Sequence, residues 1–104
     1  MKQGYLLIVE DVPDILRLLE ETLKFKGYNA VTARNGQEAL DFLFAKGKFE
    51  NLRLSSQPKV ILLDIKMPKV DGIEVLRRIK SDKRTRMIPV VIMTSSSEEK
   101  DLVT

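Results

Sequence analysis

The sequence contains no cysteine and no histidine among its 104 residues. These two absences exclude disulfide bridges, zinc sites built from Cys and His, thiol nucleophiles and every catalytic triad that needs an imidazole. Any chemistry in this chain must therefore come from carboxylates, hydroxyls, lysines or the backbone.

Long hydrophobic runs are also absent. The N-terminus lacks the apolar segment of a signal peptide, and no run approaches the length that spans a membrane, so we expect a cytoplasmic protein with no membrane partner. Lys and Arg exceed Asp and Glu by 18 to 15, a mild excess that does not by itself indicate nucleic-acid binding. A hydrophobic fraction of 43% and a charged fraction of 32% are typical of one small globular domain over residues 1–104.

The hydrophobic pattern alternates between two kinds of segment. Four short, mainly apolar runs have the composition of strands in a parallel sheet: 5–9, 28–33, 60–63 and 90–93. Three segments with apolar residues at helical spacing separate them: one from Pro13 to Gly27, one from the Asn35-Gly36 turn to Gly47, and one after Asp71-Gly72. We expect an irregular loop over 48–58, and a fourth helix that begins at Ser95 or Ser96, each of which has Glu three residues later. This order predicts an α/β fold with a parallel sheet.

Carboxylates and a hydroxyl stand at the ends of three of these strands. Glu10 and Asp11 follow the first strand, Asp64 ends the third, and Thr94 follows the fourth. Ligands of open parallel sheets bind beyond the carboxyl ends of the strands, so we expect these side chains to converge. Two carboxylates about 4 Å apart repel by roughly 4 kcal/mol at an effective dielectric near 20, so the cluster needs protons or a cation.

Oxygen ligands without imidazole or thiolate favour a hard cation, and Mg²⁺ is the one that typically takes a few carboxylates and keeps its waters. The alternative is that Glu10, Asp11 and Asp64 are ordinary polar residues at strand ends that cap helices. That alternative suits any one of them taken alone, whereas the three together favour a metal site.

Three motifs, in order and at consistent spacing, resemble the receiver domain of two-component response regulators. They are VEDVPD at 9–14, ILLDIKMPKVDG at 61–72 and IPVVIMTSS at 88–96, and ARNGQEAL at 33–40 also fits. The resemblance implies a flavodoxin-like parallel sheet with flanking helices and strand order 2-1-3-4, without the family's fifth strand and fifth helix. It also implies a cytoplasmic phosphoprotein of a two-component system.

The resemblance assigns a metal site and an acceptor. Asp64 matches the phosphoacceptor, and Asp11 matches the residue that binds Mg²⁺ directly. Glu10 matches the acidic neighbour that usually holds the metal through water. Asp64 also contacts the metal in this assignment, and Lys66 lends its backbone carbonyl.

The resemblance also assigns the parts of a switch. Thr94 matches the hydroxyl that turns toward the phosphoryl group, and Lys66 and Ser96 stand where receiver side chains tune the lifetime of the phosphoaspartate. Pro68 and Gly72 fit the tight loop after the acceptor strand.

The function implied is that of a phosphoacceptor in a histidine–aspartate phosphorelay. Mg²⁺-dependent transfer to Asp64 from a histidine kinase or phosphotransfer protein would drive a conformational switch. Such a protein phosphorylates and dephosphorylates itself and is not a turnover enzyme. The alternative is a receiver-like interaction or oligomerisation module that is not phosphorylated. The set of Glu10, Asp11, Asp64 and Thr94 favours the first reading, and the absence of the family's strand-five lysine favours the second.

The absence of the family's fifth strand from this sequence leads to a further expectation about self-association. Without it, the strand at 90–93 becomes an exposed apolar edge, which invites self-association with another chain. Three explanations stay open: a fragment of a longer receiver, a natural truncation, or an oligomer that completes itself by sharing elements. We favour a receiver domain that is incomplete at its C-terminus because the chain is a fragment.

Residues 77–86 (RRIKSDKRTR) carry six basic residues in ten and raise the alternative of a nucleic-acid patch. No aromatic residue interleaves them and Asp82 interrupts the run, so we favour a solvated helix end and expect no nucleic-acid partner. A phosphatase of the haloacid dehalogenase type is also disfavoured, because Lys66 stands where its second aspartate is needed.

Overall fold

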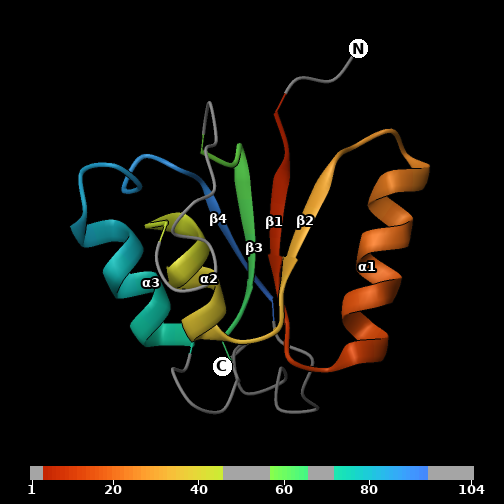
Figure 1. Ribbon diagram of the computed structural model, residues 1–104, viewed down its shortest axis with the longest axis horizontal. Helices are drawn as coiled ribbons and strands as arrows, with labels where there is room; N and C mark the ends of the chain where they lie inside the picture. The colour runs from red at the N-terminus through yellow and green to blue at the C-terminus, as the bar shows by residue number, and fades with distance from the viewer. Residues whose placement is uncertain (1–3, 46–56, 66–71, 94–104) are drawn as a thin grey trace, which may run out of the picture.

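The structure is a computed structural model that describes residues 4–45, 57–65 and 72–93. These residues contain four strands: β1 (Leu6–Val9), β2 (Ala30–Ala33), β3 (Val60–Asp64) and β4 (Val90–Met93). All neighbouring strands are parallel, in the order β2-β1-β3-β4 (Figure 1). The predicted α/β class, the flavodoxin-like sheet and the strand order 2-1-3-4 are thus confirmed.

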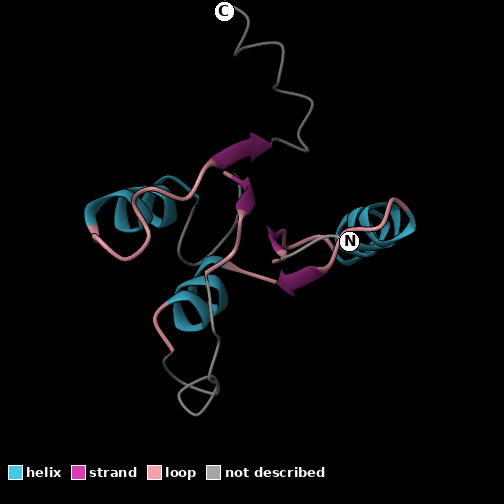
Figure 2. Cartoon of the chain, turned by 90° about the horizontal axis from the view of Figure 1, so that it is seen from above, coloured by secondary structure: helices cyan, strands magenta, loops and turns pink. Residues whose placement is uncertain are grey.

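In the described part of the chain, three helices cover the sheet: α1 (Pro13–Phe25), α2 (Gly36–Leu43) and α3 (Gly72–Ser81). Figure 2 shows α1 on one face of the sheet and α2 with α3 on the other. Each of these helices joins one strand to a later parallel strand, which is the arrangement that βαβ connections require. The sheet is therefore the middle layer of three.

Local signals explain where the first two helices begin and end. Pro13 stands at the start of α1, where its missing N–H costs nothing. The helix ends in a Schellman motif, since Gly27 N donates to Lys24 O, Tyr28 N donates to Leu23 O, and Gly27 has a φ of +94°. This motif is why the second strand begins at Ala30, two residues later than the sequence predicted.

The N-terminus of α2 is capped from two sides. The Asn35 side chain accepts a hydrogen bond from Glu38 N at 2.7 Å, and Glu38 Oε1 accepts one from Arg34 N at 2.7 Å. Both bonds satisfy backbone donors at the helix entry, as a capping box does. The turn that brings the chain from β2 into α2 is thereby fixed.

The main hydrophobic core lies between the sheet and the α2–α3 layer. Its buried members come from all of these elements and from the turn before β4: Leu7, Val9, Ala33, Ala39, Leu40, Phe42, Leu43, Ile61, Leu63, Val75, Ile79 and Ile88. Side chains alternate along a strand, so Ile8, which is also fully buried, belongs to the opposite face with Leu16 of α1. The core thus holds β1 and β3 in the middle of the sheet.

The fourth strand lies at the edge of the described sheet. Its Val91 and Ile92 side chains are 49% and 43% exposed, in line with the apolar edge that the sequence predicted. The predicted helix after residue 95 and most of the predicted loop over 48–58 lie outside the described residues. Among the helices that the structure describes, none has the length and apolarity needed to cross a lipid bilayer.

Candidate metal centre

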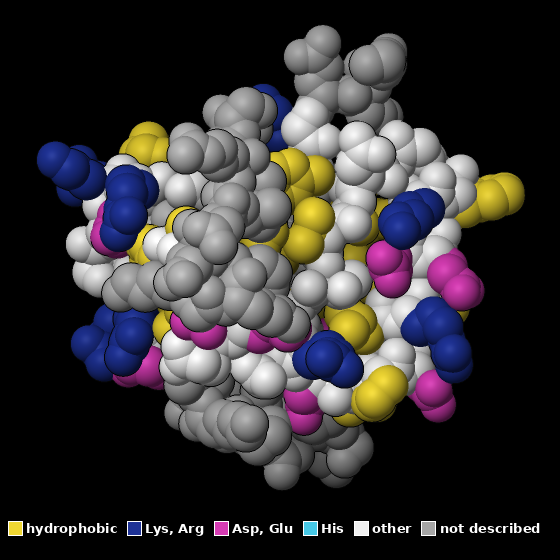
Figure 3. Space-filling view, in the orientation of Figure 1, with side chains coloured by type: hydrophobic (Ala, Val, Ile, Leu, Met, Phe, Trp, Pro, Cys, Tyr) yellow, Lys and Arg dark blue, Asp and Glu magenta, His cyan; other side chains and the backbone are white. Residues whose placement is uncertain are grey.

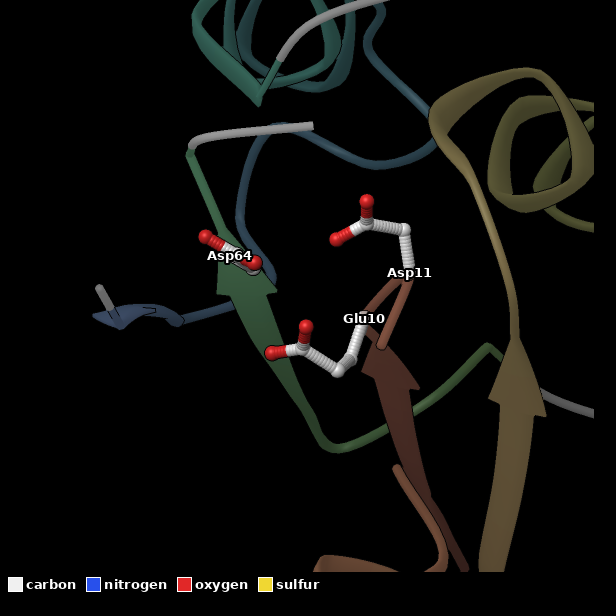
Figure 4. A group of neighbouring side chains, drawn as sticks. All are labelled: Glu10, Asp11 and Asp64. Carbon is white, nitrogen blue, oxygen red and sulfur yellow. The ribbon is translucent and has the colours of Figure 1, made fainter. Parts of the chain in front are cut away.

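Three carboxylates converge at the carboxyl ends of β1 and β3. Asp64 is the last residue of β3 and Glu10 directly follows β1, and the parallel pairing of Val9 with Leu63 places Glu10 beside Asp64. Oxygen atoms of Glu10, Asp11 and Asp64, one from each, all lie within 4.8 Å of one another. Figure 4 shows the three side chains around one shared space. The convergence predicted from the strand ends is confirmed for these three carboxylates, whereas Thr94, the fourth predicted member, lies outside the described residues.

Two of the three carboxylates are buried. Glu10 is 1% exposed and Asp64 is 0% exposed, whereas Asp11 is half-buried. Buried carboxylates are costly unless hydrogen bonds or opposite charges compensate them. Val12 N donates to Glu10 Oε2 at 3.1 Å, and the Glu10 side chain is hydrogen-bonded to Asp64. Among the residues that the structure describes, neither Glu10 nor Asp11 forms an ion pair with a lysine or arginine.

The burial of Glu10 and the neighbouring carboxylates determine its protonation. The pKa of Glu10 is raised to about 7, mainly by burial and in addition by the negative charges of Asp64 and Asp11, while the hydrogen bond from the Val12 N–H opposes the rise. A hydrogen bond between two carboxyl groups requires one proton, which a Glu10 with this pKa holds below neutral pH. Above neutral pH the site carries three negative charges within a small volume.

The donor set fits a hard divalent cation. Three carboxylates supply only oxygen atoms, and Mg²⁺ is held in proteins by one or a few carboxylates together with water. A cation would take the place of the Glu10 proton and remove the mutual repulsion of the three groups. Glu10, Asp11 and Asp64 are therefore the described residues that can hold a metal.

Backbone hydrogen bonds join the two strand ends to neighbouring strands. Glu10 N donates to Ala33 O at 3.1 Å, and Ile65 N donates to Met93 O at 3.3 Å. The Val12 amide that binds Glu10 was not foreseen from the sequence, because a backbone donor has no residue-type signal. Three predicted site residues, Lys66, Thr94 and Ser96, lie outside the described residues.

The basic segment at 77–86 does not form a uniform cationic surface. Glu74 pairs with both Arg77 and Arg78, and Asp82 pairs with Arg84, so three of the six basic side chains have carboxylate partners. Figure 3 shows Lys and Arg side chains with Asp and Glu beside them on this face of the molecule. The pattern supports the expected solvated helix end.

A family model described as the response regulator receiver domain matches residues 6–104. Among curated proteins, the chain is 40% identical to the response regulator Rcp1 of Synechocystis sp. over 94% of this chain and 66% of that protein. It is 37% identical to two Bacillus subtilis transcriptional regulatory proteins, YkoG and PhoP, and covers 40% and 36% of their lengths. The chain thus spans less than two thirds of each of these relatives.

Solved structures give the same result. The bacteriophytochrome response regulator AtBRR matches with a TM-score of 0.85 and 46% identity over 99% of this chain and 74% of that chain. The phosphorylated cyanobacterial phytochrome response regulator RcpA matches with a TM-score of 0.80 and 38% identity over 98% of this chain and 72% of its own. A Mn²⁺-bound form of response regulator Rcp1 matches with a TM-score of 0.81 and 39% identity, at 97% and 72% coverage. Neighbours of this fold have thus been seen with a metal and with a phosphoryl group.

Proposed function

The chain belongs to the response regulator receiver domain family, and on that premise we propose that it is a phosphoacceptor of a two-component phosphorelay. The observation that carries the proposal is the convergence of Glu10, Asp11 and Asp64 at the ends of β1 and β3. Asp64 accepts the phosphoryl group, and Asp11 and Glu10 hold Mg²⁺ beside it. The donor is a histidine kinase or a phosphotransfer protein, or a small acyl phosphate in its place.

The chemistry follows from the position of Asp64 at the end of a buried strand. One of its carboxylate oxygens attacks the phosphorus in line with the leaving group, so a P–O bond forms at Asp64. The donor's bond to phosphorus breaks, and the donor keeps that electron pair. Bound Mg²⁺ supplies positive charge near the transferring oxygens. Glu10 must lose its proton to act as a ligand, and Asp11 is available to the cation from the half-buried side of the site.

The same proposal includes a switch. Phosphorylation adds roughly −1.5 to −2 charges at Asp64, and we assign Thr94 as the hydroxyl that turns toward this charge. The Lys66 carbonyl completes the metal ligands, and the Lys66 and Ser96 side chains set how long the phosphoaspartate lasts. A two-state segment after β4 then carries the signal to a protein partner. The cytoplasmic location expected from the sequence stays a prediction.

The experiment that tests the function is intact mass spectrometry after incubation with Mg²⁺ and acetyl phosphate. The wild type should gain the mass of one phosphoryl group, and the gain should disappear with EDTA. Asp64→Asn should gain nothing. Asp41→Asn, which changes another half-buried carboxylate far from the site in sequence, should behave as the wild type. A wild-type protein that is folded yet gains no mass would refute the proposal.

One observation favours a second candidate, a receiver-like interaction module that works without phosphorylation. The exposed Val91 and Ile92 give β4 an apolar surface of the kind that pairs with another chain. Light scattering separates the two candidates when it is combined with the mass assay. The module predicts an oligomer that Ile92→Lys dissociates and that acetyl phosphate leaves unchanged.

A further inference from the structure

Gly72, the first residue of α3, lies directly against the backbone that leaves the end of β3. A Cβ atom built on Gly72 would lie 2.6 Å from the Asp64 carbonyl oxygen and 3.0 Å from the Ile65 carbonyl carbon. It would come still closer to the Ile65 Cα. Non-bonded carbon atoms normally stay about 3.5–4.0 Å apart. All three atoms belong to the backbone, so no side-chain rotation can relieve the contact.

Position 72 requires glycine because there is no space for a side chain, and not because of its backbone conformation. Among the described glycines, positive φ angles occur at Gly4 and Gly27, and not at Gly72. Gly27 is the opposite case, with a φ of +94° and no atom within 4 Å of a built Cβ. An alanine at 72 would be favoured by helix propensity, by up to about 1 kcal/mol over glycine, if the contact with residues 64 and 65 did not exist.

A side chain at position 72 would displace the end of β3, the strand that carries Asp64. The helix cannot move outward freely, because Val75 and Ile79 are fully buried in the core. The end of β3 is held less firmly, since the hydrogen bond from Ile65 N to Met93 O is long at 3.3 Å. An added methyl group would therefore push the backbone of Asp64 and Ile65 by roughly 1 Å, the difference from a normal contact.

We propose that Gly72 is a positioning residue that sets the place of the Asp64 carboxylate relative to Glu10 and Asp11. The inference rests on the proposed function, because it concerns the acceptor of that reaction. Gly72 touches neither donor nor metal, and it acts only through the backbone of residues 64 and 65. A misplacement of about 1 Å in a site for in-line transfer can cost on the order of a hundredfold in rate.

The test compares Gly72→Ala with Gly27→Ala. The second variant serves as a matched control, because alanine at a φ of +94° also destabilises the fold while nothing surrounds its Cβ. For each variant, the rate of phosphorylation by acetyl phosphate is measured at saturating Mg²⁺, together with the Mg²⁺ dissociation constant and the urea midpoint. The measurements are made well below both unfolding transitions, in trimethylamine N-oxide if Gly72→Ala needs it to stay folded.

We expect Gly72→Ala to lower the rate at saturating Mg²⁺ by at least tenfold and to weaken Mg²⁺ binding. Gly27→Ala should keep both values within twofold of the wild type at a similar loss of stability. A folded Gly72→Ala protein with a wild-type rate would overturn the inference and leave the proposed function intact. Equal losses of rate in both variants would also overturn it, because they would indicate a merely structural role. A wild type that gains no phosphoryl group would overturn the proposed function and this inference with it.

Discussion

From the repulsion within the carboxylate cluster, we predict that replacing Asp64 with asparagine stabilises the metal-free protein. The substitution keeps the shape of the side chain and removes one of three negative charges. Oxygen atoms of Glu10, Asp11 and Asp64 lie within 4.8 Å of one another. At an effective dielectric near 20, one ionised pair at that distance repels by about 3.5 kcal/mol.

Asp64 faces two such partners, but a shared proton and side-chain relaxation lower the repulsion. We therefore expect Asp64→Asn to raise the free energy of unfolding by about 2 kcal/mol or more at pH 8 in EDTA. The gain should be smaller at pH 5.5, because Glu10, whose pKa burial raises to about 7, is then protonated and neutral.

Urea denaturation followed by circular dichroism at both pH values measures this difference. Asp41→Asn is the control, and its free energy of unfolding should change by less than about 0.5 kcal/mol at either pH, as for ordinary surface changes. Excess Mg²⁺ should reverse the order of stability, since it binds the wild type and loses a ligand in Asp64→Asn. An Asp64→Asn protein that is less stable than the wild type at pH 8 in EDTA would refute the reasoning.

The described contacts give three further predictions. Mg²⁺ should bind more tightly as pH rises from 6 to 8, because the cation must displace the Glu10 proton; a flat calorimetric profile would contradict this. The metal-free protein should lose stability as pH rises from about 4.5 to about 7 and change little above that, since the folded pKa of Glu10 of about 7 lies above the ordinary 4.5 and in this range the folded state holds a proton that the unfolded state releases. Thr85→Val should destabilise the fold by about 1–3 kcal/mol in urea, because buried Thr85 Oγ1 donates to Ile79 O at 2.6 Å and the carbonyl would be left unpaired. As a control, Thr22→Val, which changes an exposed residue of α1, should change the free energy of unfolding by only a few tenths of a kcal/mol. A loss as large as that of Thr85→Val would indicate a general effect of valine.

Much of the fold could be predicted because its signals are local. Continuous apolar runs mark β1, β3 and β4, and Pro13, Gly27 and Asn35 mark helix ends by mechanisms that the structure shows in place. The adjacency of β1 and β3 is different, since nothing in the chain order requires those two strands to pair. It came from the resemblance to receiver domains, and the pairing of Val9 with Leu63 confirms it.

The parts of the site that were not foreseen depend on tertiary distances. The Val12 amide contacts Glu10 only because the chain turns directly after β1. The role of Gly72 depends on how closely α3 approaches the end of β3, and no periodicity in the sequence reports that distance. The burial of Glu10 also had no sequence signal, because it lies just beyond the apolar run of β1. The domain limits and the roles of Lys66, Thr94 and Ser96 stay predictions.

The most direct test of the central claim is to locate the phosphoryl group. The protein would be incubated with Mg²⁺ and acetyl phosphate and then treated with borohydride, which reduces an aspartyl phosphate to homoserine. Tandem mass spectrometry of the peptides would identify the modified residue. Homoserine at position 64, dependent on Mg²⁺, is the predicted result. Homoserine at another aspartate, or none in a folded protein, would contradict the assignment of Asp64 as the phosphoacceptor.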